Sequence, residues 1–296
     1  MPRGAAPVQP PAARVSCAMR FLMLALLSIG GSVPLAGAQS AAPSPPSGVL
    51  LSGRDLTLMA GATVGAAALS FLDVRVANAF ADSGFHTRHP GLGTAAKRAS
   101  VVTETALMIT GGLVYGLARI QKDDGTADVA AHATISVASA AMAIQVVRGA
   151  LGRARPHVIN ADGETRHSDA YDFQLLHGFT SFDYRSFPSM HAMASFAVAS
   201  ALAQEMRRRD TPNRSVIAPA LYVGAAMPAL ARMYLDEHWT SDIAMGVFLG
   251  VFAGQKVVMY THDHPDNRLD HALLKPRRSV TVSYGTGGLS FGLASF

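Results

Sequence analysis

The sequence predicts an all-α fold, a bundle of about six apolar helices followed by a short C-terminal β-hairpin. Apolar segments of helical length recur along the chain and alternate with polar stretches. Hydrophobic residues make up 49% of the 296 residues and charged residues only 15%, against roughly 25% charged residues in ordinary soluble proteins. The tail changes to a two-residue alternation that is typical of strands. The composition indicates a membrane protein or an unusually apolar bundle.

The N-terminus resembles an export signal. Arg20 precedes a short apolar run, and a small-residue cleavage pattern ends at Ala38. We therefore expect a signal peptide at 1–38 and a linker rich in proline and serine at 39–54. The only cysteine, Cys17, lies in this signal peptide, so the mature chain is expected to form no disulfide. Export places the protein in a bacterial cell envelope.

The helical domain is expected at residues 55–275. Alanine and glycine are frequent in its apolar segments, which allows helices to approach closely. The predicted helices cover residues 56–72, 101–118, 129–147, 192–206, 215–234 and 242–259. Polar stretches separate them at residues 73–100, 119–128, 157–187 and 207–214.

The segment 279–296 is predicted to form the hairpin. Apolar residues alternate on both sides of a glycine-rich turn, at Val280, Val282, Tyr284, Leu289, Phe291 and Leu293. An isolated hairpin is only marginally stable in water. We expect this one to pack on the bundle or on a partner.

Arg148 and Arg155 form the first of three clusters whose side chains are suited to bind a substrate or react with it. They are seven residues apart, almost two helical turns, so both point the same way if the helix persists. Pro156 favours a helix end at Arg155. Two guanidinium groups suit a phosphate dianion, because each can bond two oxygens. A basic flank beside a membrane helix is the alternative interpretation.

The second cluster is Pro188-Ser189-Met190-His191, just before a predicted helix. Ser189 is suited to cap the helix, whose free N–H groups and positive dipole end attract anions. His191 is placed where a proton donor could meet a leaving oxygen. The alternative is a capping serine beside an ordinary half-exposed histidine.

The third cluster contains Arg232, His238 and Asp242. His238 and Asp242 are four residues apart, so the carboxylate can accept a hydrogen bond from one ring nitrogen. That bond fixes the tautomer and leaves the other nitrogen free to attack. Arg232 can neutralise phosphate charge, and Trp239 can wall the site or mark a membrane interface. A structural His–Asp pair joining two helices is the alternative.

The three spacings, in this order, resemble the signature of the type 2 phosphatidic acid phosphatase (PAP2) family. Its superfamily includes bacterial acid phosphatases and vanadium haloperoxidases. The resemblance spans about residues 125–260. It implies a PAP2-like helical domain and a phosphoric ester hydrolase. The reaction implied is metal-independent hydrolysis of a phosphomonoester or diphosphate through a phosphohistidine intermediate.

The resemblance also implies roles for individual residues. His238 corresponds to the nucleophile, Asp242 to its carboxylate partner and His191 to the general acid. The residues that correspond to the phosphate-binding positions are Arg148, Arg155, Ser189, Met190 and Arg232. No cofactor or metal is implied for the hydrolase, and vanadate is expected as an inhibitor or as an alternative cofactor.

Three positions depart from the family's pattern. Arg148 replaces the usual lysine, which keeps the charge but alters its geometry. Met190 replaces a glycine and has less freedom at positive φ. Ala231 precedes Arg232 where a serine is usual, which removes one hydroxyl.

Two other functions are compatible with these residues. One is a vanadate-dependent, haloperoxidase-like enzyme with vanadate in the phosphate cradle. The other is a non-catalytic envelope protein that binds phosphorylated lipid. The expected partner is a phosphorylated lipid or a small phosphoester. No basic run resembles a nucleic-acid-binding surface, and the sequence does not reveal the oligomeric state.

Some further polar residues have simpler interpretations. His262, His264 and His271 lie among acids near the end of the domain, and we expect a solvated loop there rather than a metal site. Glu104 and His132 interrupt apolar helices, where hydrogen bonds between helices are the expected role.

The arginine triplet 207–209 bears on membrane orientation. It lies in the turn between two predicted helices, and the positive-inside rule places such turns in the cytoplasm. The three clusters would then face the periplasm. A cleaved leader would deliver residue 39 to the periplasm, and three full spans before Arg148 would then place the site in the cytoplasm. The chain is therefore either a soluble periplasmic bundle, or an inner-membrane protein in which one early helix does not span and the site faces the periplasm.

Overall fold

The computed structural model describes residues 51–159, 163, 169–264 and 267, together with two strands at 279–285 and 288–294. The predicted signal peptide lies outside the described residues, as does nearly all of the predicted linker. The helices are α2 (Gly53–Ser70), α3 (Asp73–Ala81), α4 (Ser83–Arg88), α5 (Pro90–Ala99), α6 (Glu104–Gln121), α7 (Asp124–Leu151), α8 (Met190–Arg208), α9 (Arg214–Tyr234) and α10 (Thr240–Asp263). Two single-turn 3-10 helices follow α7, η2 (His177–Phe179) and η3 (Phe182–Tyr184).

The all-α prediction is confirmed for this part of the chain. The six predicted apolar helices are α2, α6, α7, α8, α9 and α10, each shifted or extended by a few residues. The most consequential extension is that of α10, which continues to Asp263. His262 therefore lies in the last turn of a helix and is half-buried, so the expectation of a solvated loop at this residue is wrong.

The polar stretch 73–100 also folds into helices, α3 to α5. Asp82 caps α4 by accepting hydrogen bonds from the backbone N–H groups of Gly84 and Phe85. Pro90 begins α5, where its missing N–H costs nothing. Phe80 and Phe85 are buried in the main core cluster. Local capping and tertiary burial therefore produce helices that the apolar pattern did not predict.

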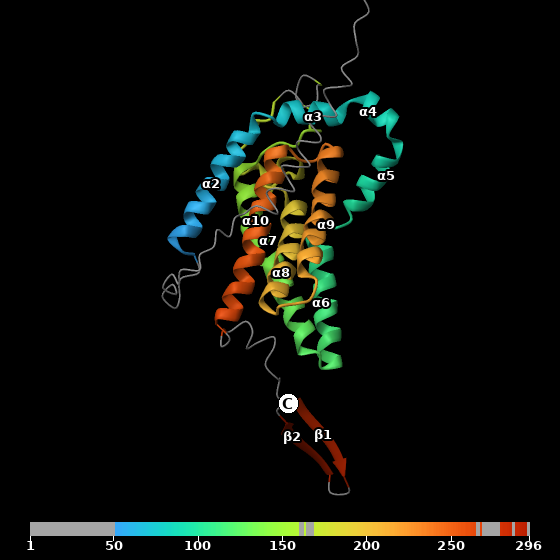
Figure 1. Ribbon diagram of the computed structural model, residues 1–296, viewed down its shortest axis with the longest axis vertical. Coiled ribbons are helices and arrows are strands. Elements are labelled where there is room, and N and C mark those ends of the chain that lie inside the picture. Colours follow the sequence, from blue (N-terminus) through green and yellow to red (C-terminus); the bar gives the residue numbers. More distant parts are fainter. Residues whose placement is uncertain are drawn as a thin grey trace, which may run out of the picture.

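Helix α8 is the central element of the bundle. It packs against α6, α7, α9 and α10, and Figure 1 shows it between α10 and α9. Its closest neighbour is α10, whose glycines allow the two backbones to approach. A Cβ atom at Gly250 would lie 2.3 Å from the carbonyl oxygen of Met193. Small residues thus set the separation of the two helices.

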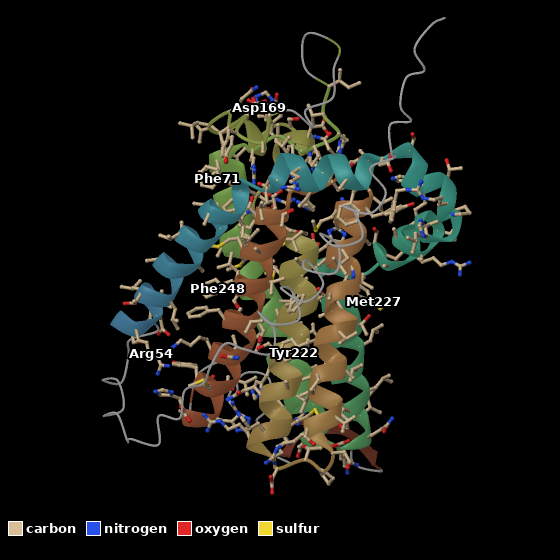
Figure 2. The ribbon with its side chains drawn as sticks, turned by 45° about the horizontal axis from the view of Figure 1, so that its top comes forward. Arg54, Phe71, Asp169, Tyr222, Met227 and Phe248 are labelled. Carbon is tan, nitrogen blue, oxygen red and sulfur yellow. The ribbon has the colours of Figure 1, made fainter. Side chains whose placement is uncertain are left out.

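The outer surface of the bundle is apolar. Three helices, α7, α9 and α10, are long and apolar enough to cross a membrane, and the count rises to five if the bent pairs α2–α3 and α5–α6 are single spans. Large apolar side chains are exposed all around, among them Ile120, Met142 and Val216. Figure 2 shows Phe71 and Met227 on opposite sides of the bundle. These features indicate a membrane protein and favour the membrane-embedded alternative.

The two strands are β1 (Ser279–Gly285) and β2 (Gly288–Ala294). They pair antiparallel, with Ser279 opposite Ala294 and Gly285 opposite Gly288. The residues of the turn and of the chain end lie outside the described residues. The C-terminal hairpin therefore stays a prediction.

Candidate active site

The three clusters lie at one end of the bundle, the upper end in Figure 1. Helices α7 and α9 finish there, shortly after Arg148 and Arg232, whereas α8 and α10 begin there. The described parts of the segment between α7 and α8 cross this end. Asp169, exposed in Figure 2, belongs to that segment. Antiparallel packing thus brings together residues that are far apart in sequence.

A tight turn after α7 directs the first cluster inward. Gly152 ends the helix with φ of 59°, and a Cβ atom there would lie 1.8 Å from the carbonyl oxygen of Gln174. Glycine is therefore required at this position. Arg148 is buried, and its Nε atom has no hydrogen-bond partner among the described residues. Arg155 is also buried, and its guanidinium lies 4.2 Å from the centre of the Phe182 ring.

Glu237 joins the first and third clusters. Its carboxylate accepts a hydrogen bond from Nη1 of Arg155, and Oε2 lies 2.9 Å from Nη2 of Arg232. Burial by itself would raise the pKa of Glu237, but the two arginines hold this pKa below its usual value. A carboxylate thus bridges two of the guanidinium groups that were predicted to bind phosphate. Glu237 was not among the predicted site residues, although its place directly before His238 was an available signal.

His238 and Asp242 are adjacent, as their spacing predicts. Nδ1 of His238 lies 3.5 Å from Oδ2 of Asp242, which is longer than an ordinary hydrogen bond. The same Oδ2 atom accepts closer hydrogen bonds from the Ser186 hydroxyl at 2.5 Å and the Trp239 backbone N–H at 2.8 Å. Asp242 therefore faces one side of the imidazole, and the other ring nitrogen, Nε2, points away from it.

The side chain of His238 is only 1% exposed. Burial lowers the pKa of His238 to about 4, although the neighbouring Asp242 opposes this shift. Arg155 and Arg232 lower the pKa further through their positive charge. The ring is therefore neutral near pH 7, which is the protonation state that a nucleophile requires.

Arg153 fixes the orientation of Asp242. Its Nη1 atom donates hydrogen bonds to Oδ1 of Asp242 at 2.5 Å and to the Ser241 hydroxyl at 2.8 Å. Its Nη2 atom donates to Asp73 on α3 at 2.8 Å. All of these side chains are buried. Neither Arg153 nor Asp73 was predicted, and no sequence signal connected two residues 80 positions apart.

The N-terminus of α8 supplies the second cluster. Ser189 is the N-cap residue, and its hydroxyl accepts a hydrogen bond from the Ala192 N–H at 3.5 Å. Met190 opens the helix and is buried in the core formed with α7. Since Met190 is helical, the left-handed conformation that a glycine would permit is not needed here. Ala231 is likewise buried in the core.

His191 lies in the first turn of α8 and is half-buried. Burial lowers the pKa of His191 to about 3, and the charges of Arg232 and His238 add to this effect. Its electrostatic coupling to both residues shows that the second and third clusters are close to each other. Both predicted catalytic histidines are thus neutral at pH 7 in the structure.

Comparison with known proteins finds a family match over this part of the chain. Residues 129–265 match the model of the PAP2 superfamily. This region of the chain belongs to the PAP2 superfamily. It extends from α7 through α10 and contains all eight predicted site residues.

Among solved structures, the chain is similar to the crystal structure of a transmembrane PAP2-type phosphatidylglycerolphosphate phosphatase from Bacillus subtilis. The sequence identity is 17%, the match covers 72% of this chain and 97% of that chain, and the TM-score is 0.37. No curated protein matches the chain. The assignment of residues 129–265 to the PAP2 superfamily therefore rests on the family match, and membership of this family supports a phosphatase.

Proposed function

We propose that the protein is a membrane phosphatase that releases phosphate from a phosphorylated lipid through a phosphohistidine intermediate. One observation carries the proposal. A buried, neutral imidazole, that of His238, lies between a carboxylate fixed in place by Arg153 and the guanidinium groups of Arg155 and Arg232. This arrangement suits attack on a phosphate group, because the nucleophile is uncharged and the surrounding charge is positive.

Substrate binding begins with replacement of the carboxylate of Glu237. The phosphate takes its place on Arg155 and Arg232, and Arg148 contributes the third guanidinium group. The hydroxyl of Ser189 and the backbone N–H of Met190, at the N-terminus of α8, bind the remaining oxygen. These donors stabilise the equatorial oxygens while the phosphoryl group is transferred.

In the first chemical step, Nε2 of His238 forms a bond to phosphorus and the bond from phosphorus to the alcohol oxygen breaks. His191 passes the proton that the substrate's phosphate carries to that oxygen, so the leaving group departs as a neutral alcohol. Asp242 stabilises the positive charge on the phosphorylated imidazole. In the second step, water attacks phosphorus and gives a proton to His191. The N–P bond breaks, which releases inorganic phosphate and restores His238.

The apolar surface of the bundle supports a lipid as the substrate. The candidate spans α7, α9 and α10 all have one end at the site. A site at the end of membrane-spanning helices lies near the lipid headgroups. A lipid phosphate can therefore reach the site while its acyl chains stay in the bilayer.

A phosphate-release assay on the full chain in detergent tests the proposal. The substrates are phosphatidate, a prenyl diphosphate and a soluble phosphomonoester. We expect the wild type to release phosphate and His238→Ala to retain less than about 0.1% of this activity, since removing a nucleophile costs several orders of magnitude. The control His264→Ala changes a histidine outside the site and is expected to stay fully active.

Quenching during turnover is expected to trap acid-labile phosphate on the wild type and none on His238→Ala. Turnover by folded His238→Ala near the wild-type rate would contradict the mechanism. Vanadate is expected to inhibit phosphate release. Halide oxidation with vanadate and peroxide would instead support the haloperoxidase-like alternative.

A further inference from the structure

A second cluster of titratable side chains lies at the opposite end of the bundle. It consists of His132 near the start of α7, Glu205 near the end of α8 and His262 in the last turn of α10. Glu205 is 205 − 191 = 14 residues beyond His191 on α8, which corresponds to about 21 Å along the helix. The cluster is therefore separate from the candidate active site.

Both imidazoles converge on one carboxylate oxygen. Nδ1 of His132 lies 2.6 Å from Oε1 of Glu205, and Nε2 of His262 lies 3.0 Å from the same atom. The two ring centres are 5.6 Å apart and the rings are inclined at 66°. One ligand atom from each residue lies within 4.8 Å of the other two.

The two contacts, at 2.6 and 3.0 Å, are somewhat shorter than the separations between ligand atoms in a metal site. Ligand atoms bound to tetrahedral zinc at about 2.0–2.1 Å are about 3.3 Å from one another. Two imidazole nitrogens and one carboxylate oxygen are a ligand set that zinc prefers. Binding an ion therefore requires the three side chains to rotate so that these contacts widen.

The charge around Glu205 is only partly compensated. Its side chain is 2% exposed, and a buried carboxylate requires a cationic partner or a metal. Nε of Arg209 lies 2.9 Å from Oε2 of Glu205, but the same guanidinium lies 3.1 Å from a carboxylate oxygen of Asp128. One arginine is thus shared by two acids. Glu205, Asp128 and Arg209 together carry a net negative charge, which favours a divalent cation.

Arg209 also leaves one oxygen of Glu205, Oε1, available to an ion. It donates to Oε2 of Glu205, which Nε2 of His262 also contacts at 3.1 Å, whereas Oε1 is the oxygen that contacts both imidazoles. Hydrogen bonds of this kind orient a ligand and keep it in one geometry. The carboxylate is therefore already positioned to bind an ion through a single oxygen.

We propose that His132, Glu205 and His262 bind a divalent cation of the zinc type. The ion joins α7, α8 and α10 at the end of the bundle remote from the active site, and water completes its coordination. Its role is to hold the three helices together, with no part in the phosphatase reaction. The competing explanation is a metal-free network in which each imidazole donates an N–H to Glu205.

Zinc binding to the full chain in detergent distinguishes the two explanations. After removal of metals with a chelator, the protein is dialysed against zinc and its unfolding is measured. We expect about one zinc per chain and a higher Tm with zinc. His262→Ala is expected to weaken binding at least about tenfold, as loss of a ligand should, and to abolish the gain in Tm.

The matched control is His264→Ala, two residues further along the chain. The ring of His264 stacks on Tyr260 and its Nδ1 atom contacts the Tyr260 carbonyl oxygen at 3.0 Å, so it lies outside the cluster. We expect this variant to bind zinc as the wild type does. Glu205→Gln preserves shape but removes the anionic ligand, and it provides a second test if His262→Ala folds poorly.

Phosphatase activity serves as an independent measurement. Metal-free wild type and folded His262→Ala are both expected to keep activity within about twofold, because the active site lies about 21 Å away along α8. The proposal is overturned if the wild type binds no zinc at micromolar concentration, or if binding is unchanged in His262→Ala and Glu205→Gln. Either outcome would establish the metal-free network.

Discussion

At the scale of single residues, Glu237 has the most informative position. Its carboxylate bridges Arg155 and Arg232, where the proposed reaction needs a phosphate. The same contact has two consequences. It neutralises two buried guanidinium groups while no substrate is bound, and it competes with any anion that enters.

Glu237→Gln is therefore expected to bind phosphate more tightly. Glutamine keeps the shape of the side chain but removes its charge, so an incoming anion no longer displaces a carboxylate. We expect the Kd for inorganic phosphate or vanadate to fall about tenfold, which corresponds to about 1.4 kcal/mol. Without ligand, the Tm should decrease, because Arg155 and Arg232 lose their shared anion. Calorimetric titration and thermal unfolding measure the two effects.

Glu104→Gln is the matched control for this substitution. Glu104 acts on Arg232 electrostatically without the direct ion pair that Glu237 forms. Its effect on the Kd is expected to be less than about threefold, since a charge without direct contact is screened by solvent. Equal effects of the two variants would mean that general charge, rather than occupancy of the phosphate position, controls binding.

The protonation of the two histidines predicts the pH dependence. The pKa of His238 is lowered to about 4 and that of His191 to about 3. A lowered histidine pKa keeps the neutral form down to acidic pH, so His238 stays a nucleophile until the pH falls below about 4. The proton for the leaving group must then enter with the substrate. A phosphomonoester carries that proton below its second pKa of about 6.

We therefore expect kcat/KM to be highest between about pH 4 and 6 and to fall about tenfold per pH unit above this range. The alkaline limb should shift when a substrate with a different second pKa is used. Activity measured across pH with two such phosphomonoesters tests this. An acid limb near the ordinary histidine pKa, or an alkaline limb independent of the substrate, would count against neutral histidines.

At the scale of helices, the glycines of α10 determine how the two halves of the site meet. A Cβ atom at Gly246 would lie 2.5 Å from the carbonyl oxygen of Ser189, and one at Gly254 would lie 2.6 Å from that of Ala197. Both distances are too short for a Cβ atom, and Gly254 is the more crowded of the two, but only Gly246 is beside the N-terminus of α8. Comparing substitutions at Gly246 and Gly254 therefore separates the effect of the helix contact on stability from its effect on the site.

Gly246→Ala and Gly254→Ala are both expected to destabilise the protein by about 1–3 kcal/mol through overpacking. Only Gly246→Ala should also impair catalysis. It displaces Ser189 and His191 relative to Asp242, and a shift of about 1 Å can cost about 100-fold in rate. Thermal unfolding and kcat of the folded fraction measure the two properties. Gly224→Ala, where no atom lies within 4 Å of the added Cβ, is the neutral control.

The sequence predicted the long helices and missed the short ones for the same physical reason. Apolar runs such as that of α10 identify helices that are buried on several sides. The helices α3 to α5 depend on local caps, such as Asp82, and on tertiary burial of single aromatic residues such as Phe85. The motif residues were predictable because their spacing lies within short segments. The contacts of Arg153 with Asp73, and of Arg155 with Glu237, depend on folding and leave no pattern in the sequence.

At the scale of the whole molecule, the arrangement of charge and apolar surface predicts a membrane orientation. The predicted phosphatase site and the arginine triplet 207–209 lie at opposite ends of α8. Between these ends, apolar side chains are exposed on two candidate spans, among them Met142 on α7 and Val223 on α9. The positive-inside rule places the arginine triplet in the cytoplasm. The site would then face the periplasm, as the sequence analysis expects.

Cysteine labelling in intact cells can test this orientation. Asp169→Cys introduces a thiol at the site end and Pro212→Cys one at the turn between α8 and α9, both at exposed positions. A membrane-impermeant maleimide is expected to label Asp169→Cys in intact spheroplasts and to label Pro212→Cys only after lysis, because a bilayer separates the two ends. The unmodified chain, whose single cysteine is Cys17, gives the background.

Labelling of both variants before lysis would show that the bundle does not span the membrane and would support the soluble periplasmic alternative. Labelling of Pro212→Cys alone would place the site in the cytoplasm.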